Sequence, residues 1–111
     1  MIYLASPYTD DDPNVVGARV EKTTAETARI LIRGIHVFSP IVYGAEMAAV
    51  VGKSFEHWKR FDLHMLDIAE ELWVLMLPGW ESSVGVQEEI DYAKNIGMHI
   101  IYHHPTREED E

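Results

Sequence analysis

Two carboxylic acids stand out in this sequence because each lies on a helix face that should be apolar. Asp62 falls on the same side of a helical wheel as Trp58 and Met65, within about 60° of both. Glu89 lies about 60° from Val86, on the flank of a later helix. Burying an unpaired carboxylate costs several kcal/mol of folding free energy. Two such acids pointing inward from separate elements indicate acid/base or covalent chemistry.

Each acid also has a structural explanation. Asp62 could pair with Arg60 or cap its helix, and Glu89 could interact with the dipole at the start of its own helix. The same wheels place Lys59 on the solvated face opposite Asp62, and they point Glu88 away from the packed face, towards solvent.

Small and aromatic residues lie near these acids. Ser83 opens a helix and, with the free N–H groups of its first turn, could hold an anion, although an ordinary N-cap also explains it. Gly85, one turn before Glu89, leaves space above that carboxylate. Tyr8 follows Ser6-Pro7 at a strand end and could reach the same pocket or simply pack.

Strands and helices alternate along the chain. Apolar runs predict strands, and runs of helical period with caps predict helices, of which the one carrying Asp62 should be capped by Ser54. This alternation predicts an α/β fold, a three-layer flavodoxin- or Rossmann-like domain with a parallel sheet of four or five strands. The expected strands are 2–5, 36–38, 72–77 and 99–102; the expected helices are 13–34, 54–70 and 82–97; residues 41–53 could be a loop or a helical turn.

Ligands of such folds bind at the carboxyl ends of the strands. The segments expected there are Ser6-Pro7-Tyr8, Ser39-Pro40 with the loop that follows, and residues 78–85.

Composition limits the function further. Length predicts one domain, over residues 1–105, with an acidic tail over 106–111. The net charge of −10 argues against a nucleic-acid polymer as partner. No run is apolar enough to span a membrane, and a sequence without cysteine is compatible with the cytoplasm, where we expect the protein. The histidines lack metal-binding spacing, so no metal is expected.

Four pieces of the chain, taken in order, form a recognisable pattern. They are residues 2–8 (IYLASPY), Phe38-Ser39-Pro40, Asp62 with Leu66, and Ser83-x-Gly85-x-x-x-Glu89-Ile90-x-x-Ala93. Together they resemble the nucleoside 2-deoxyribosyltransferase-like superfamily, which includes deoxynucleoside 5′-monophosphate N-glycosidases. The chain also looks like a family of short bacterial and phage proteins of unknown function within that superfamily. The resemblance spans residues 2 to about 101.

The resemblance implies a role for each candidate residue. Glu89 matches the nucleophile that attacks C1′ of the sugar, and Asp62 matches the acid that protonates the departing base. Tyr8 falls near the aromatic residue that positions the nucleophile, and Ser83 matches the serine that holds a 5′-phosphate. Such enzymes form homo-oligomers and need no cofactor. Burial would raise the pKa of Asp62, and the N-terminal half of the helix would keep Glu89 ionised.

Two rival functions remain open. A nucleotide-binding or sensing module could keep the pocket without turnover, with both acids as polar lining. A structural or partner-binding protein could instead satisfy its inward acids with Arg29, Arg33 or Arg60.

Overall fold

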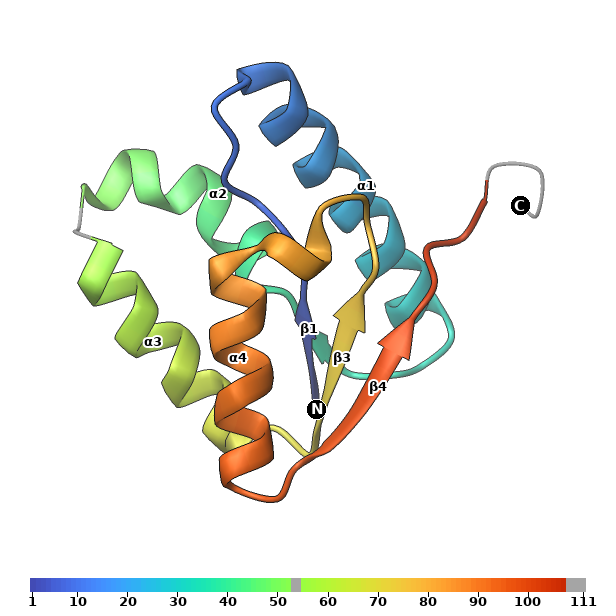
Figure 1. The fold of residues 1–111 in the computed structure, drawn as a ribbon. Helices are drawn as coiled ribbons and strands as arrows, with labels where there is room; N and C mark the ends of the chain where they lie inside the picture. The colour runs from blue at the N-terminus through green and yellow to red at the C-terminus, as the bar shows by residue number, and fades with distance from the viewer. Residues whose placement is uncertain (53–54, 108–111) are drawn as a thin grey trace.

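The computed structural model describes residues 1–52 and 55–107. Within them, a parallel sheet of four strands has the order β2-β1-β3-β4, and helices cover both of its faces (Figure 1). This architecture confirms the predicted three-layer α/β fold. The strands are β1 (Ile2–Ala5), β2 (Val37–Phe38), β3 (Glu71–Leu75) and β4 (His99–His103).

One face of the sheet is covered by α1 (Pro13–Ile32). The predicted start of this helix is confirmed, because Asp12 is the N-cap and its carboxylate accepts a hydrogen bond of 2.9 Å from the backbone N–H of Asn14. Side chains from β1, α1 and β3 pack together beneath the helix. These are Ile2, Leu4, Ile30, Leu75 and Leu77.

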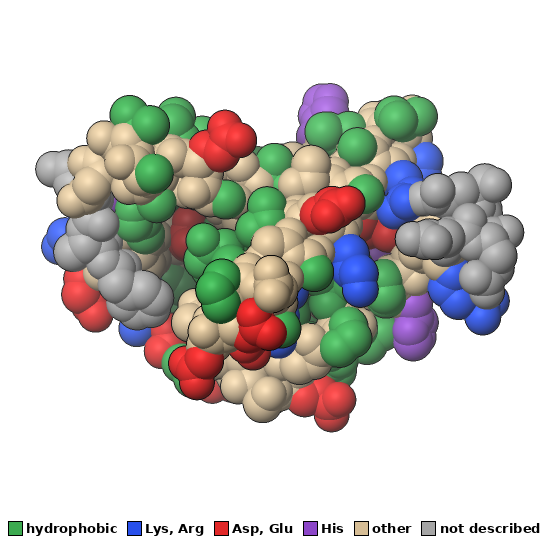
Figure 2. All heavy atoms as spheres, turned by 90° about the horizontal axis from the view of Figure 1, so that it is seen from above, with side chains coloured by type: hydrophobic (Ala, Val, Ile, Leu, Met, Phe, Trp, Pro, Cys, Tyr) green, Lys and Arg blue, Asp and Glu red, His purple; other side chains and the backbone are tan. Residues whose placement is uncertain are grey.

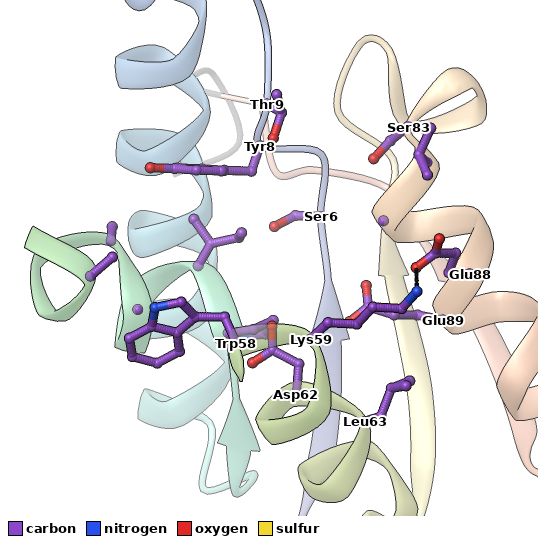
Figure 3. A pocket seen from close by; sticks show the side chains of 17 residues that line it. Ser6, Tyr8, Thr9, Trp58, Lys59, Asp62, Leu63, Ser83, Glu88 and Glu89 are labelled. Carbon is purple, nitrogen blue, oxygen red and sulfur yellow. Dashed lines mark ion pairs between the residues drawn. The ribbon is translucent and has the colours of Figure 1, made fainter. Parts of the chain in front are cut away.

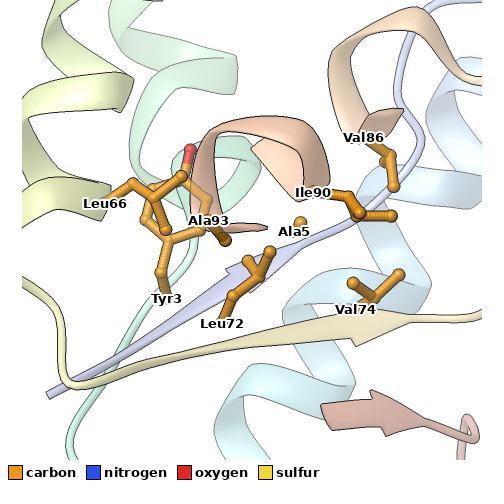
Figure 4. Packing of buried hydrophobic residues seen from close by; sticks show 8 residues of the cluster. All are labelled: Tyr3, Ala5, Leu66, Leu72, Val74, Val86, Ile90 and Ala93. Carbon is orange, nitrogen blue, oxygen red and sulfur yellow. The ribbon is translucent and has the colours of Figure 1, made fainter. Parts of the chain in front are cut away.

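The opposite face is covered by α3 (Phe55–Ile68) and α4 (Val84–Asn95). Successive side chains of β1 alternate between the two faces, and all are buried because this central strand is covered on both sides. The larger core therefore lies between the sheet and these two helices (Figure 4). It contains Tyr3, Ala5, Leu66, Leu72, Val74, Val86, Ile90 and Ala93.

The ambiguous segment after β2 is mostly a helix, α2 (Pro40–Val51). Ser39 caps it, since its hydroxyl accepts a hydrogen bond of 3.2 Å from the backbone N–H of Val42. Gly52 ends it with φ 64°, which glycine adopts without strain. The predicted cap Ser54 lies outside the described residues. Several apolar side chains of α2 are exposed, namely Val42, Tyr43, Met47, Val50 and Val51.

The remaining boundaries lie close to those predicted. A short 3₁₀ turn, η1 (Trp80–Ser82), leads from β3 to α4, whose N-cap is Ser83. Thr106, where the acidic tail was expected to begin, is not free, because its backbone N–H and its hydroxyl both donate to Glu26. Across the described residues, no helix combines the length and apolar character needed to cross a bilayer.

The connections diverge between β1 and β3. The chain leaves β1 through α1 towards β2, and it leaves β3 through α4 towards β4 on the other side of the sheet. Crevices form at such points, beyond the carboxyl ends of the strands. The fold thus places a crevice where residues 6–8 and the start of α4 meet.

Candidate active site

A cavity of about 550 Å³ lies at this point, bounded by the end of β1 and by α2, α3 and α4. Its volume falls in the range of pockets that hold small molecules. Figure 2 views the molecule from the end where the strands terminate, and it shows this face hollowed, with acidic side chains inside the hollow. The side chains that line the cavity are drawn in Figure 3.

Glu89 reaches the cavity from the second turn of α4, whose packed face fixes its direction through Val86 and Ile90. The hydroxyl of Tyr3 donates a hydrogen bond to Oε2 of Glu89. Tyr3 is fully buried in the central strand, and burial, with the nearby charge of Glu89, raises the pKa of its hydroxyl far above the usual range. Tyr3 therefore stays protonated and holds the Glu89 carboxylate in one orientation.

The expected ionisation of Glu89 is contradicted. Its pKa is raised to about 8: burial is the largest cause, the hydrogen bond from Tyr3 lowers the pKa by less, and the charges of Asp62 and Glu88 add to the increase. The helix dipole acts mainly within the first turn, and Glu89 lies beyond it. Desolvation therefore outweighs the dipole and favours a protonated Glu89 at neutral pH.

Asp62 enters the cavity from α3, and burial raises its pKa to about 6, in the direction expected from its position on an apolar stripe. Within residues 1–52 and 55–107, its carboxylate has no hydrogen-bond or ion-pair partner, so Arg60 does not neutralise it. Asp62 is thus a carboxyl group that can hold a proton near neutral pH and release it.

Most of the predicted site residues come together around these two acids. Pro7 and Ser39 do not line the cavity: Pro7 is buried, and the hydroxyl of Ser39 caps α2. The predicted residues that do line it are Ser6, Tyr8, Pro40, Asp62, Ser83, Gly85 and Glu89.

The aromatic residue hydrogen-bonded to Glu89 is Tyr3, which the sequence analysis missed, whereas Tyr8 forms part of the cavity wall. A signal was present, since Tyr3 alternates with the other residues of a strand that was predicted to be apolar, and in the structure it shares with Ala5 the face against which α4 packs. A tyrosine inside a buried strand needs a partner for its hydroxyl.

Lys59 and Glu88 were both predicted to face solvent, and both line the cavity instead. Their side chains form an ion pair, with 3.1 Å between Nζ of Lys59 and Oε2 of Glu88 (Figure 3). For Lys59 the prediction was wrong on the wheel itself, since three residues at about 100° each place Lys59 only about 60° from Asp62. For Glu88 the wheel gives the direction of Cβ only, and a long flexible side chain can bend back along the helix surface. This ion pair joins α3 to α4 across the cavity.

Trp58 lines the cavity near Asp62 (Figure 3). Its indole N–H is buried and has no hydrogen-bond partner in the described part of the chain. An unmet buried donor is costly, so this group is a candidate contact for an acceptor on a ligand. Small and apolar residues of α2 complete this side, namely Pro40, Ile41, Gly44, Ala45 and Ala48.

Ser83 has the structural role that was its simpler explanation. Its hydroxyl accepts a hydrogen bond of 3.3 Å from the backbone N–H of Val86, as an N-cap does. Among the described residues, no group of three histidine, aspartate or glutamate side chains is arranged so that it could hold a metal ion.

The fold and the cavity define a parallel α/β domain with two carboxyl groups in a small-molecule pocket. Residues 1–104 match the model of a domain of unknown function, DUF1937, and the chain belongs to that family. Among curated proteins, none matches this sequence. The family description names no activity, so the similarity to the nucleoside 2-deoxyribosyltransferase-like superfamily stays a prediction.

Proposed function

We propose that the protein cleaves or transfers the N-glycosidic bond of a nucleoside, deoxynucleoside or 5′-monophosphate through a covalent glycosyl intermediate on Glu89. The observation that carries this proposal is the pair of acids in one cavity: Glu89 is held by Tyr3, and Asp62 has no partner in the described part of the chain. Retaining glycosidases divide the same work between two carboxyl groups.

The pair reacts in the form whose single proton lies on Asp62 and not on Glu89. In the first half-reaction, the ionised Glu89 oxygen forms a bond to C1′ while the bond from C1′ to the base nitrogen breaks. The electron pair of the breaking bond goes to the base, which takes the proton of Asp62. In the second half-reaction, Asp62 accepts a proton from water or from a second base, which attacks C1′ and releases Glu89. The two outcomes are hydrolysis and base exchange.

The Tyr3 hydroxyl supports both half-reactions. It orients the Glu89 carboxylate before attack, and it donates a hydrogen bond to that carboxylate when the sugar leaves. Tyr3 is therefore a positioning residue in this mechanism.

The proposal extends to partners and location. The small molecule would occupy the cavity without a cofactor, and the protein would act in the cytoplasm as a homo-oligomer. The exposed apolar side chains of α2 support self-association, because a helix with apolar residues on several sides is usually covered.

The test is base release from deoxyribo- and ribonucleosides and their 5′-monophosphates, with and without a second free base. Glu89→Gln is expected to abolish release, and Asp91→Asn, an exposed acid on the same helix, to retain it. Intact-mass spectrometry during turnover should show the protein gaining one sugar, on wild type only. Equal release by wild type and Glu89→Gln would refute the proposal.

One observation favours a second candidate, a nucleotide-binding module without turnover. A Glu89 pKa of about 8 leaves the proposed nucleophile largely protonated at neutral pH. This version predicts that calorimetry detects ligand binding while no base is released at any pH between 6 and 9.

A further inference from the structure

The ion pair between Lys59 and Glu88 has a position that the proposed reaction does not use. It crosses the cavity from α3 to α4, and Figure 3 shows the Lys59 side chain running beside Glu89 to reach Glu88. Both side chains are partly exposed, at 35% for Lys59 and 40% for Glu88. Such a pair contributes little to folding stability, so its position calls for another explanation.

The substrate's orientation follows from the roles of the two acids. The base must lie by Asp62, where Trp58 and α2 form the wall, and C1′ must lie at Glu89. Figure 3 shows Ser83 and Glu88 on the other side of Glu89 from Asp62 and Trp58. The 5′ end of the sugar, which points away from the base, is therefore directed towards Ser83 and Glu88.

The charges at that end are unfavourable for a phosphate. Among the described residues that line the cavity, Lys59 is the one cationic side chain, against three acids, and its ammonium group is already paired. The Ser83 hydroxyl is engaged as the N-cap. The first-turn N–H groups of α4 attract anions, but the Glu88 carboxylate lines the same cavity one turn further along the helix and repels a dianion. A neutral 5′-hydroxyl could instead donate a hydrogen bond to that carboxylate.

We propose that Glu88 is a specificity-determining residue that makes the site select an uncharged nucleoside over the 5′-monophosphate. It does so in two ways: its ion pair keeps the Lys59 ammonium group from binding a phosphate, and its own negative charge repels one. This inference rests on the proposed function for the orientation of the ligand. The selection works by repulsion, because the negative charge of Glu88 lies where the monophosphate would carry its own negative charge.

The experiment measures dissociation constants by calorimetry for matched pairs, each common 2′-deoxynucleoside and its own 5′-monophosphate. The quantity of interest is the ratio of the two constants, which cancels any effect of a substitution on the rest of the ligand. The variants are Glu88→Gln, Lys59→Met, the double variant with both changes, and Asp91→Asn, which removes one exposed negative charge from the same helix.

Wild type should bind the nucleoside more tightly, by roughly tenfold or more. Glu88→Gln frees Lys59 and removes one negative charge, so it should improve monophosphate binding relative to the nucleoside by roughly tenfold. Lys59→Met should increase the discrimination, and the double variant should lie between the two single variants. Asp91→Asn should leave the ratio as in wild type.

The outcomes separate this inference from the proposed function. Binding with the predicted ratios but without base release would remove the enzymatic function and keep the charge selection. Base release with a wild-type preference for the monophosphate, or with a ratio unchanged in Glu88→Gln, would keep the function and overturn the selection. Failure to bind either member of every pair would overturn both.

Discussion

Two regions of the molecule bury acids in opposite ways. On the α1 side of the sheet, the carboxylate of Glu26 accepts hydrogen bonds from the backbone N–H of Thr106 at 2.8 Å and from its hydroxyl at 3.0 Å. Nε2 of His103 lies 3.2 Å from Oε2 of Glu26, and Nη1 of Arg29 lies 3.4 Å from Oε1 of Glu26. On the other side, Glu89 receives a hydrogen bond from Tyr3, and Asp62 has no partner among the described residues.

The pKa values follow this difference. Burial alone would raise the pKa of Glu26, but the hydrogen bonds from Thr106 and His103 lower it below its ordinary value. Burial raises the pKa of Asp62 to about 6 and that of Glu89 to about 8, with too few donors to offset it. A satisfied buried acid stabilises the fold, whereas an unsatisfied one is held ready to exchange a proton.

The largest effect should come from removing the unsatisfied acid that gives up a proton. Asp62→Asn is expected to lower kcat/KM about 10²- to 10⁴-fold for ordinary nucleosides, the usual contribution of a general acid. The loss should be much smaller for 7-methyl-2′-deoxyguanosine, whose cationic base leaves without protonation. An equal loss on both substrates would mean that Asp62 is not the acid.

The next largest effect should be on folding stability, when the hydrogen bonds of Glu26 are weakened. Glu26→Gln keeps the shape but loses the charge in the hydrogen bonds from Thr106 and His103, so the free energy of unfolding should fall by about 2–3 kcal/mol. Urea denaturation measures the change, and base release by the folded variant should stay at the wild-type rate. An unchanged free energy of unfolding would show that the hydrogen-bonded Glu26 does not stabilise the fold, and the proposed difference between the two regions would be wrong.

Much of the fold could be predicted because local patterns and tertiary packing agree. The Asp12-Pro13 start of α1 and the continuous apolar run of β3 each admit one simple interpretation. The helix α2 does not, because its apolar residues show neither a clear helical stripe nor strand alternation. Its conformation depends on the cap at Ser39 and on packing against α1.

The two acids of the site were predictable from the residues because each conflicts with its surroundings, and the strand ends indicated the segments around them. Asp62 and Glu89 are visible as acids on apolar faces. The Glu26 network is not, because Glu26 and Thr106 are 80 residues apart and meet only after the sheet forms. The Lys59–Glu88 pair depends on side-chain conformation, about which a helical wheel carries no information.

A smaller effect concerns the one hydrogen bond that Glu89 receives from Tyr3. A plot of wild-type kcat/KM against pH should be bell-shaped, with apparent pKa values of about 6 and about 8 for its two limbs. These values belong to the Asp62–Glu89 pair as a whole. Tyr3→Phe removes the donor that lowers the pKa of Glu89, so the upper limb should move to higher pH and kcat/KM should fall roughly tenfold. A lower rate with unmoved limbs would point to a packing defect instead.

The smallest effect is on how stability depends on pH. The pKa of Glu89 is raised on folding from 4.5 to about 8, so the folded protein retains a proton that the unfolded chain has lost, and stability falls as pH rises through that interval. Asp62 acts in the same direction between 3.8 and about 6, whereas Glu26, with a lowered pKa, loses its contribution only as pH falls below 4.5. Glu89→Gln should therefore be more stable than wild type at pH 8, by about 1–2 kcal/mol after allowance for solvent in the cavity.

Thermal unfolding between pH 5 and 8 measures this difference. The wild-type Tm should fall across the range, and the curve of Glu89→Gln should be flatter, with the two closest at pH 5, where Glu89 is still largely protonated in the folded protein. Asp91→Asn, the exposed control on the same helix, should keep the wild-type slope. Parallel curves for wild type and Glu89→Gln would show that Glu89 is as well satisfied as Glu26, and the contrast between the two regions would disappear.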